Sequence, residues 1–356
     1  MKLVIDGRWV RTEYHDGISR YTAGLVEGFL AAGREVTVLI HDDAQRRMLP
    51  GGVAYLKVNQ PISVRELFLA RRLNEFGADV VFSPLQVMGF WGRKYRLILT
   101  LQDIIYYHHP KPPTNLPWYV RAAWRAFYSA KWPQRLLLNQ ADRVATVSET
   151  SKKFIEKYRL TKRDIVVVYN APSIEPPAKP IAQMTKNIVY MGSFMPYKNV
   201  ETLIAGMNQL PRDYVLHLPS KIAQERQLEL EALAEPGVHL QFHNGISDEA
   251  YAELLAGAHC LATATKEEGF GLPVTEAQKL GTPVVCSDLP VLREVASTGA
   301  LYFAPDDADG FAVAIRSLED PAIRQQLIAA GVAQAATFSW QKSAEKLYDT
   351  ATKLYS

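Results

Sequence analysis

Short runs of β-branched and apolar residues alternate with longer stretches of helical spacing along this chain, and no other feature constrains its fold as strongly. The alternation is typical of βαβ units and parallel sheets. In the first half we expect strands at 3–6, 35–40, 53–58, 79–83, 96–101, 143–148 and 165–170. In the second half we expect them at 187–192, 213–219, 238–243, 259–265, 282–288 and 300–305.

The segment 171–180, "APSIEPPAKP", carries four prolines in ten residues. Because proline lacks a backbone donor and fixes φ, we predict a linker here. A chain of 356 residues exceeds the usual size of one hydrophobic core. We therefore predict two Rossmann-like domains, at 1–172 and 181–338, and a last helix at 339–356. One long doubly wound sheet is the alternative.

The composition is that of a soluble globular protein, with 48% hydrophobic and 22% charged residues. No apolar run approaches the roughly 20 residues of a membrane-spanning helix, and the start, "MKLVID", reads as a strand and not as a signal peptide. Cys260 and Cys286 lie in apolar, strand-like runs, which argues against a disulfide framework or a metal knuckle. We expect a cytoplasmic protein.

Charge is divided unevenly along the chain. Residues 1–173 contain 26 Lys and Arg against 15 Asp and Glu, whereas residues 174–356 contain 14 against 22. This asymmetry predicts an anionic partner for the first half. Nucleic acid is not expected, because no nucleic-acid-binding motif accompanies the charge.

The stretch 118–138 interleaves aromatic and basic residues on what we expect to be a helix. Such a helix suits an anionic membrane surface, and we favour a peripheral position at the inner face of the membrane. An amphipathic core helix with a solvated basic edge is the alternative. The residues concerned are Trp118, Trp124, Phe127, Tyr128 and Trp132, with Arg121, Arg125, Lys131 and Arg135.

The string "EEGFGLPVTE" at 267–276 predicts an anion site at a helix start. Pro273 suits the first turn of a short helix and Gly281 suits the position just after it. The preceding glycines leave backbone N–H groups and the positive end of the dipole open to an anion. We place Glu268 before the glycines and Glu276 in the first turn, so that a diphosphate lies between two acids that each hold a sugar ring. In the alternative interpretation, Glu276 only complements the helix dipole and Glu268 is solvated.

The longer string "EEGFGLPVTEAQKLGTPVV" (267–285) resembles the E-x7-E segment of retaining GT-B glycosyltransferases of family 4. Five further stretches resemble this family in the same order: "DGISRY" (16–21), "ATVSETSKK" (145–153), "YMGSFMPYKNV" (190–200), "FHNGISDEAYAELLAGA" (242–258) and "FSW" (338–340). The resemblance implies an α/β fold of the GT-B type, with two Rossmann-like domains facing a central cleft. It also implies that the helix at 339–356 packs back on the first domain.

The resemblance assigns roles to individual residues. Donor contacts fall on Gly17, Gly192, Ser193, Lys198, Asn199, Gly245, Ile246, Glu268, Gly269, Phe270, Gly271, Leu272 and Glu276. Catalytic roles fall on Lys198, Glu268, Gln102 and Asp103, and acceptor contacts on Arg20, Tyr21 and Tyr106. Lys198 would neutralise the leaving diphosphate in place of a metal, so we expect neither a cofactor nor a metal.

Two positions depart from the family pattern. Many members carry an arginine where this chain has Ser193-Phe194, and many carry His-Asp where it has Gln102-Asp103. His108 and His109 follow the second pair, but six residues of extended chain reach about 20 Å, so we favour a surface loop for both.

The resemblance thus predicts a retaining hexosyltransferase that acts by front-face attack, in which the leaving phosphate accepts the acceptor's proton. GDP-mannose is the first expected donor and a UDP-sugar the second, with a glycan or a lipid-linked molecule as acceptor. A catalytically inert sugar-nucleotide-binding subunit is one alternative. A GT-B epimerase of UDP-N-acetylglucosamine is another, although it would need acid/base carboxylates that the sequence does not show.

Overall fold

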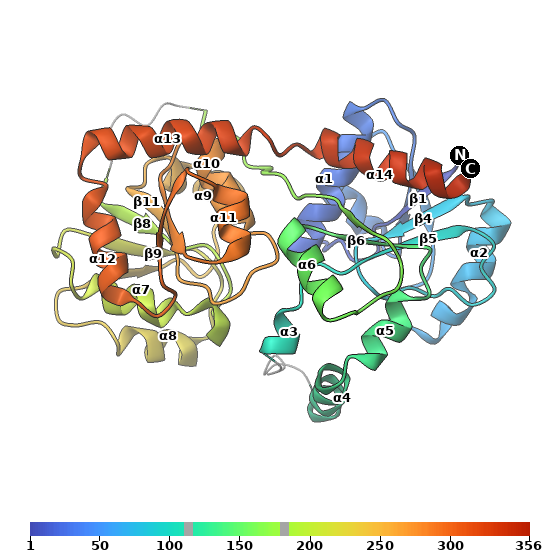
Figure 1. The fold of residues 1–356 in the computed structure, drawn as a ribbon, viewed down its shortest axis with the longest axis horizontal. Coiled ribbons are helices and arrows are strands. Elements are labelled where there is room, and N and C mark those ends of the chain that lie inside the picture. Colours follow the sequence, from blue (N-terminus) through green and yellow to red (C-terminus); the bar gives the residue numbers. More distant parts are fainter. Residues whose placement is uncertain (110–116, 179–184) are drawn as a thin grey trace. The chain divides into compact units, whose positions relative to one another are not determined.

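The computed structural model describes residues 1–109, 117–178 and 185–356 (Figure 1). Three predicted parts of the chain lie outside the described residues: the end of the linker at 179–180, the start of the second domain at 181–184, and Pro110. The chain forms two compact units. Unit 1 comprises Met1–Ala171 and Phe338–Ser356, and unit 2 comprises Pro172–Thr337.

Unit 1 is built on a seven-stranded parallel sheet in the order β3-β2-β1-β4-β5-β6-β7. Its strands are β1 (Leu3–Asp6), β2 (Thr37–Ile40), β3 (Ala54–Lys57), β4 (Val80–Ser83), β5 (Arg96–Thr100), β6 (Arg143–Thr146) and β7 (Ile165–Val167). Each lies within a predicted range. β1, β2 and β4 are buried along their whole length, and strands covered on both faces read as continuous apolar runs. The order of the first six is that of a doubly wound dinucleotide-type sheet.

The helical segments of unit 1 follow the strands along the chain. They are α1 (Gly17–Ala31), η1 (Asp43–Met48), η2 (Val64–Phe68), α2 (Leu69–Phe76), α3 (Ile105–His108), α4 (Trp118–Ser129), α5 (Trp132–Leu138), α6 (Glu149–Lys157) and α14 (Trp340–Tyr355).

Helix α14 packs against α1 across two glycines. The side chain of Asp16 accepts a hydrogen bond from the Ser19 amide and so caps α1. A Cβ atom at Gly24 would lie 2.1 Å from the Trp340 ring, and one at Gly28 would lie 2.1 Å from the Trp340 carbonyl oxygen. Both glycines are therefore required for the close approach of the two helices.

The stretch 118–138 forms two helices, so the prediction of one helix is wrong. Helix α4 ends before Ala130, which has extended backbone angles (φ −129°, ψ 147°). Helix α5 begins at Trp132 with Pro133 in its first turn. Inside one long helix, Pro133 would lack a donor and clash with the carbonyl four residues earlier, whereas a first turn accommodates it.

Unit 2 has a six-stranded parallel sheet in the order β10-β9-β8-β11-β12-β13. Its strands are β8 (Asn187–Val189), β9 (Val215–Leu218), β10 (His239–Phe242), β11 (Cys260–Thr263), β12 (Val284–Ser287) and β13 (Ala300–Phe303). Its helical segments are η3 (Pro196–Lys198), α7 (Val200–Met207), α8 (Gln224–Glu231), α9 (Asp248–Ala256), α10 (Leu272–Lys279), α11 (Pro290–Ala296), α12 (Ala308–Ser317) and α13 (Pro321–Ala335). All six predicted strands are present, and the order again is that of a doubly wound sheet.

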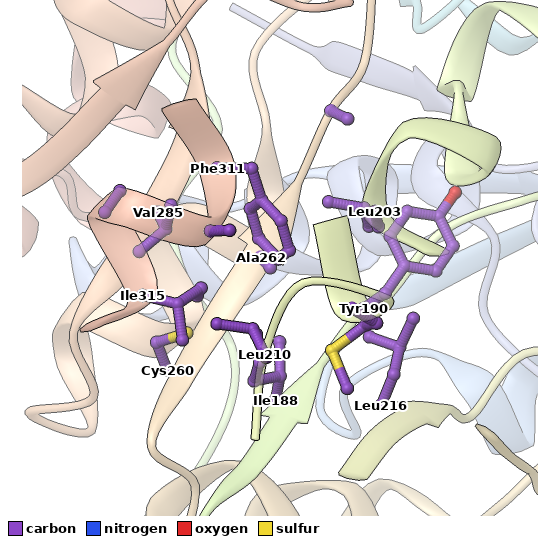
Figure 2. Close-up of a cluster of buried hydrophobic side chains, with 14 of the residues drawn as sticks. Ile188, Tyr190, Leu203, Leu210, Leu216, Cys260, Ala262, Val285, Phe311 and Ile315 are labelled. Carbon is purple, nitrogen blue, oxygen red and sulfur yellow. The ribbon is translucent and has the colours of Figure 1, made fainter. Parts of the chain in front are cut away.

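The core of unit 2 lies between one face of its sheet and helices α7 and α12 (Figure 2). Phe311 from α12 and Leu203 from α7 are fully buried there. A Cβ atom at Gly206 would lie 2.3 Å from the Phe311 ring, so this glycine allows α7 and α12 to approach. The packed core holds the ends of the strands, and hence the loops that follow them, in fixed positions.

Candidate functional site

The loops after β8 and β11 lie side by side at the carboxyl edge of the unit 2 sheet. The strand order reverses between these two strands, since β9 and β10 extend to one side and β12 and β13 to the other. In open α/β sheets, ligands bind outside the carboxyl ends of the strands at such a reversal. Most donor residues expected from the sequence belong to these two loops.

Helix α10 begins as the sequence predicts. Gly271 precedes it in the left-handed region (φ 96°), and Pro273 lies in its first turn. Gly281 follows the helix with φ 73°, the conformation that ends many helices. The N-terminus of α10 thus lies at the end of the loop that follows β11. The helix dipole favours an anion at this end of the helix.

Glu276 lies deeper in α10 than predicted. The helix starts at Leu272, so Glu276 is its fifth residue and falls in the second turn, and no acidic residue occupies the first turn. Its side chain is buried, with 4% of the residue exposed. Complementing the helix dipole does not account for it, because that effect fades beyond the first turn.

Lys198 and Glu268 form an ion pair at the same edge. The Lys198 Nζ atom lies 2.8 Å from each carboxylate oxygen of Glu268, and the side chains are 13% and 17% exposed. The two loops are also joined by their backbones, since the amide of Lys266 donates to the carbonyl of Tyr197 at 2.8 Å. A cation and an acid that are far apart in sequence are thereby fixed beside the start of α10.

The buried side chain of Asn199 links three loops by hydrogen bonds. It adopts the left-handed conformation (φ 54°), and its side-chain amide donates to the carbonyls of Ala264 at 3.2 Å and Pro305 at 2.6 Å. The residue is buried. Its amide therefore holds the loops after β8, β11 and β13 together, and this role was not foreseen from the sequence.

Gly192 and Ser193 are positioned by a buried tyrosine. The Tyr190 hydroxyl donates to the Ser193 carbonyl at 2.6 Å, and a Cβ atom at Gly192 would lie 2.7 Å from that hydroxyl. Burial raises the pKa of Tyr190 well above its usual range, which keeps it a donor. Phe194 packs on the hydrophobic core against Phe242. A partly buried phenylalanine that packs against the core thus stands where many family members were expected to have an arginine.

The loop after β10 is bound to the loop after β9. The amide of Gly245 (φ 101°) donates to the carbonyl of Pro219 at 2.8 Å, and Ile246 beside it is half-buried. Two histidines that the sequence reasoning missed lie nearby: His217 Nδ1 and His243 Nε2 are 2.9 Å apart, with stacked rings. Burial and the neighbouring His243 lower the pKa of His217 to about 4. The parallel pairing of β9 and β10 could have indicated this contact.

Three expected residues of unit 1 lie at loop and helix starts near its carboxyl edge. Gly17 is the first residue of α1, and a Cβ atom there would meet nothing within 4 Å. After β5, the Gln102 amide donates to the carbonyl of Pro84 at 3.0 Å, and Asp103 accepts from the Ile105 amide at 2.9 Å. Asp103 thus stabilises the turn that leads into α3.

The acceptor role expected for Tyr21 is wrong. Its side chain is fully buried, its hydroxyl donates to the carbonyl of Val168 at 3.2 Å, and its ring contacts Phe82 and Trp340. Tyr21 is therefore part of the core of unit 1. Arg20, the preceding residue on α1, is half-buried.

Tyr106 belongs to an aromatic cluster. Its ring centroid lies 4.7 Å from that of Trp124 and 5.4 Å from that of Tyr128, so it joins α3 to α4. The extended-chain estimate for the two histidines that follow is wrong, because Ile105–His108 forms a helical turn. His108 Nε2 lies 2.9 Å from the Tyr158 hydroxyl.

Within the part of the chain that the structure describes, no three His, Cys, Asp or Glu side chains gather in a way that would hold a metal ion. Within the same ranges, no helix is both long and apolar enough to span a bilayer.

Two family models match the chain, one in each half. Residues 15–175 match the model of Glycosyltransferase Family 4, and residues 173–333 match the model of Glycosyl transferases group 1. HepE from Anabaena, solved in complex with UDP-glucose, superposes with a TM-score of 0.75 at 17% identity, covering 99% of this chain and 100% of that one. The fold is GT-B.

Curated relatives of the GT-B chain include two bacterial enzymes. O-antigen chain mannosyltransferase B of Escherichia coli is 34% identical over 160 residues, which cover 43% of this chain and 42% of the relative. O-antigen chain mannosyltransferase RfbU of Salmonella typhimurium is 29% identical over 194 residues, which cover 52% and 53%. The matched stretches thus span about half of each relative's length.

Proposed function

We propose that the protein is a retaining glycosyltransferase that moves a hexose from a nucleoside diphosphate sugar to a glycan or lipid-linked acceptor. The observation that carries this proposal is the Lys198–Glu268 pair beside the N-terminus of α10, at the point where the strand order reverses. Both halves of the chain match glycosyltransferase models, which supports the same reaction class.

In this proposal the donor's diphosphate lies across the start of α10. Backbone dipoles there and the Lys198 ammonium stabilise the charge that develops on the leaving phosphate. In enzymes that bind a divalent cation, the cation stabilises this charge. Here the backbone dipoles and Lys198 would stabilise it, so the activity would need no metal. Glu268 and the buried Glu276 would hold hydroxyl groups of the transferred sugar and of the ribose.

We further propose front-face attack, in which departure of the nucleoside diphosphate and arrival of the acceptor occur on one side of the sugar. The C–O bond to phosphate breaks as the new glycosidic bond forms, and the leaving phosphate takes the acceptor's proton. Gln102 and Asp103 would face the acceptor and the transferred sugar, while positioning of the reactants supplies much of the rate.

Mannose from GDP-mannose is the donor we favour, because two relatives are named as mannosyltransferases. A UDP-sugar is the other candidate, because the similar structure of HepE contains UDP-glucose. A thermal-shift series with GDP-mannose, UDP-glucose and free GDP and UDP tests both. A donor at 100 times its dissociation constant should add about 2.7 kcal/mol of stability. If no nucleotide raises the melting temperature, the site assignment is wrong.

A catalytically inert sugar-nucleotide-binding subunit is a second candidate. Two observations favour it: the partly buried Phe194 stands where a cation was expected, and the Gln102 amide donates to a backbone carbonyl. Slow hydrolysis of the donor to a sugar of retained anomeric form would support the transferase. Binding without any turnover on a broad panel of acceptors would support the subunit.

We also propose a cytoplasmic location with peripheral attachment to an anionic membrane through α4 and α5. Trp118, Tyr119 and Trp132 are 78%, 60% and 63% exposed there. Two of the basic residues have partners within the protein. Arg135 donates to the carbonyl of Arg159, and Lys131 lies 3.9 Å from the centroid of the Tyr158 ring. The exposed aromatic side chains are thus the main support for this attachment.

A further inference from the structure

A second exposed apolar surface lies on unit 1, far in sequence from α4. Ile62, Val64, Leu67 and Phe68 are 87%, 81%, 57% and 64% exposed, and they fall within seven residues on and before η2. Single exposed hydrophobic residues are ordinary, but a contiguous group marks an interaction surface. We call these four residues the η2 patch.

A partly buried ion-pair network fixes the orientation of the η2 patch. Glu66, in the middle of η2, accepts from the guanidinium of Arg8 at 2.7 and 3.1 Å, from Asn59 at 2.6 Å and from the Gly89 amide at 2.8 Å. Arg8 is 2% exposed and also pairs with Asp6 at 2.8 Å. Because Glu66 is fixed inward by four hydrogen bonds, its apolar neighbours along the turn are presented to solvent.

The backbone around the patch shows the same constraint. Ile62 has φ 61°, a conformation that is uncommon for a β-branched residue and costs free energy. A Cβ atom at Gly89 would lie 2.1 Å from the Glu66 carbonyl oxygen, so the two segments touch. The hydrogen bonds of Glu66 and the backbone conformation of Ile62 fix this turn. The apolar side chains on it therefore stay exposed, although their exposure contributes no hydrophobic stabilisation.

A basic groove adjoins the patch. It is lined by Lys57, Arg65, Phe68, Arg71 and Arg72, together with Val58, Asn59, Leu69 and Glu75. Glu75, its one acidic side chain, lies 2.9 Å from Arg71, and Lys57 pairs with Asp43 outside the groove. The net charge of the groove is therefore positive, and Phe68 belongs both to the groove and to the patch.

We propose that the η2 patch and this groove form a docking surface for an anionic phospholipid bilayer. Apolar side chains at the tip of a turn, with arginines beside them, match the two layers of a bilayer surface: acyl chains below and phosphate headgroups above. The charge of the groove is complementary to anionic headgroups. The patch follows β3, whose carboxyl end shares an edge of the sheet with the ends of β1 and β5. Docking would therefore bring a membrane close to Arg20 and Tyr106, the expected acceptor residues that lie outside the core, a consequence that rests on the proposed function.

The test is co-sedimentation of the full chain with vesicles of phosphatidylcholine alone or with added phosphatidylglycerol. Wild type should bind the anionic vesicles and release at high salt. V64S/F68S should weaken binding about tenfold, and R65Q/R72Q should weaken it about fivefold per arginine at low salt. The matched control is L228S/V313S, two residues that are each 58% exposed on unit 2, and it should bind like wild type.

Three outcomes would overturn the proposal. One is binding by V64S/F68S equal to that of wild type, with loss only in W118S/Y119S, which would assign membrane contact to α4 alone. Another is equal binding to neutral vesicles, and the third is a V64S/F68S chain that changes oligomeric mass without changing vesicle binding. None of these measurements uses a nucleotide sugar. Failure of the proposed reaction, seen as no nucleotide shift of the melting temperature, therefore stays separable from failure of the docking surface.

Discussion

The ion pair between Lys198 and Glu268 predicts how substitution of either residue changes nucleotide affinity. The Lys198 ammonium donates hydrogen bonds to both carboxylate oxygens of Glu268 at 2.8 Å. The proposed diphosphate would need the same ammonium as its partner. Glu268 therefore competes with the ligand and places a negative charge beside it. The variant E268Q removes that charge and frees Lys198, so UDP and GDP without any sugar should bind more tightly.

The size of this effect follows from the geometry. Two unit charges about 6 Å apart interact by about 3 kcal/mol at an effective dielectric of about 20. Screening by salt leaves about 1.4 kcal/mol of this, so affinity should rise about tenfold. K198M should act in the opposite sense, because loss of a hydrogen bond to a charged group costs about 1.5–3 kcal/mol. Its nucleoside diphosphate affinity should fall about 10-fold to 100-fold.

Isothermal titration with UDP and GDP at two salt concentrations measures both changes. The control is K266M, which removes a lysine of the same loop that pairs with Asp306 at 2.7 Å, and it should leave affinity close to that of wild type. Without ligand, E268Q should unfold more easily by about 1–3 kcal/mol, since a mostly buried ammonium loses its partner. Affinity of E268Q equal to or below that of wild type would refute the competition between Glu268 and the diphosphate.

Three further outcomes are expected. G24A should destabilise the protein by about 1–3 kcal/mol in urea unfolding, because its Cβ would meet the Trp340 ring at 2.1 Å, and an unchanged midpoint would contradict this packing. Burial opposes ionisation of Glu66, but Arg8 outweighs it, and the pKa falls below its usual value of 4.5. A folded-state pKa that is depressed contributes stability above about pH 4.5 and loses it as the pH falls further, so E66Q should flatten the acid limb of a stability–pH curve measured by urea unfolding. Chelation with EDTA should leave donor turnover unchanged, and restoration of lost turnover by added Mg²⁺ or Mn²⁺ would count against the metal-free proposal.

The strands were predictable because parallel strands covered on both faces carry apolar runs that a single sequence displays. The start of α10 was predictable from Gly271 and Pro273, whose backbone preferences are local. Glu276 was placed one turn too early because the helix begins one residue before the proline.

Contacts between distant segments were not readable in this way. The core position of Tyr21 depends on Trp340, and the inward position of Glu66 depends on Arg8, 58 residues away. The ion pair of Lys198 with Glu268 joins residues separated by 70 positions. Propensity and spacing describe each segment alone, so they place a residue on an element but do not show which partner it meets.

The return of α14 to α1 has a consequence for synthesis on the ribosome. The strands of unit 1 leave the exit tunnel before unit 2 and α14, so the face of α1 that carries Gly24 and Gly28 is not covered until Trp340 has been synthesised. All of unit 2 emerges before α14 does. Unit 2 can therefore fold while unit 1 still lacks α14. Nascent unit 1 thus exposes the apolar face of α1 until α14 has been synthesised, and a chaperone could bind that face in the interval.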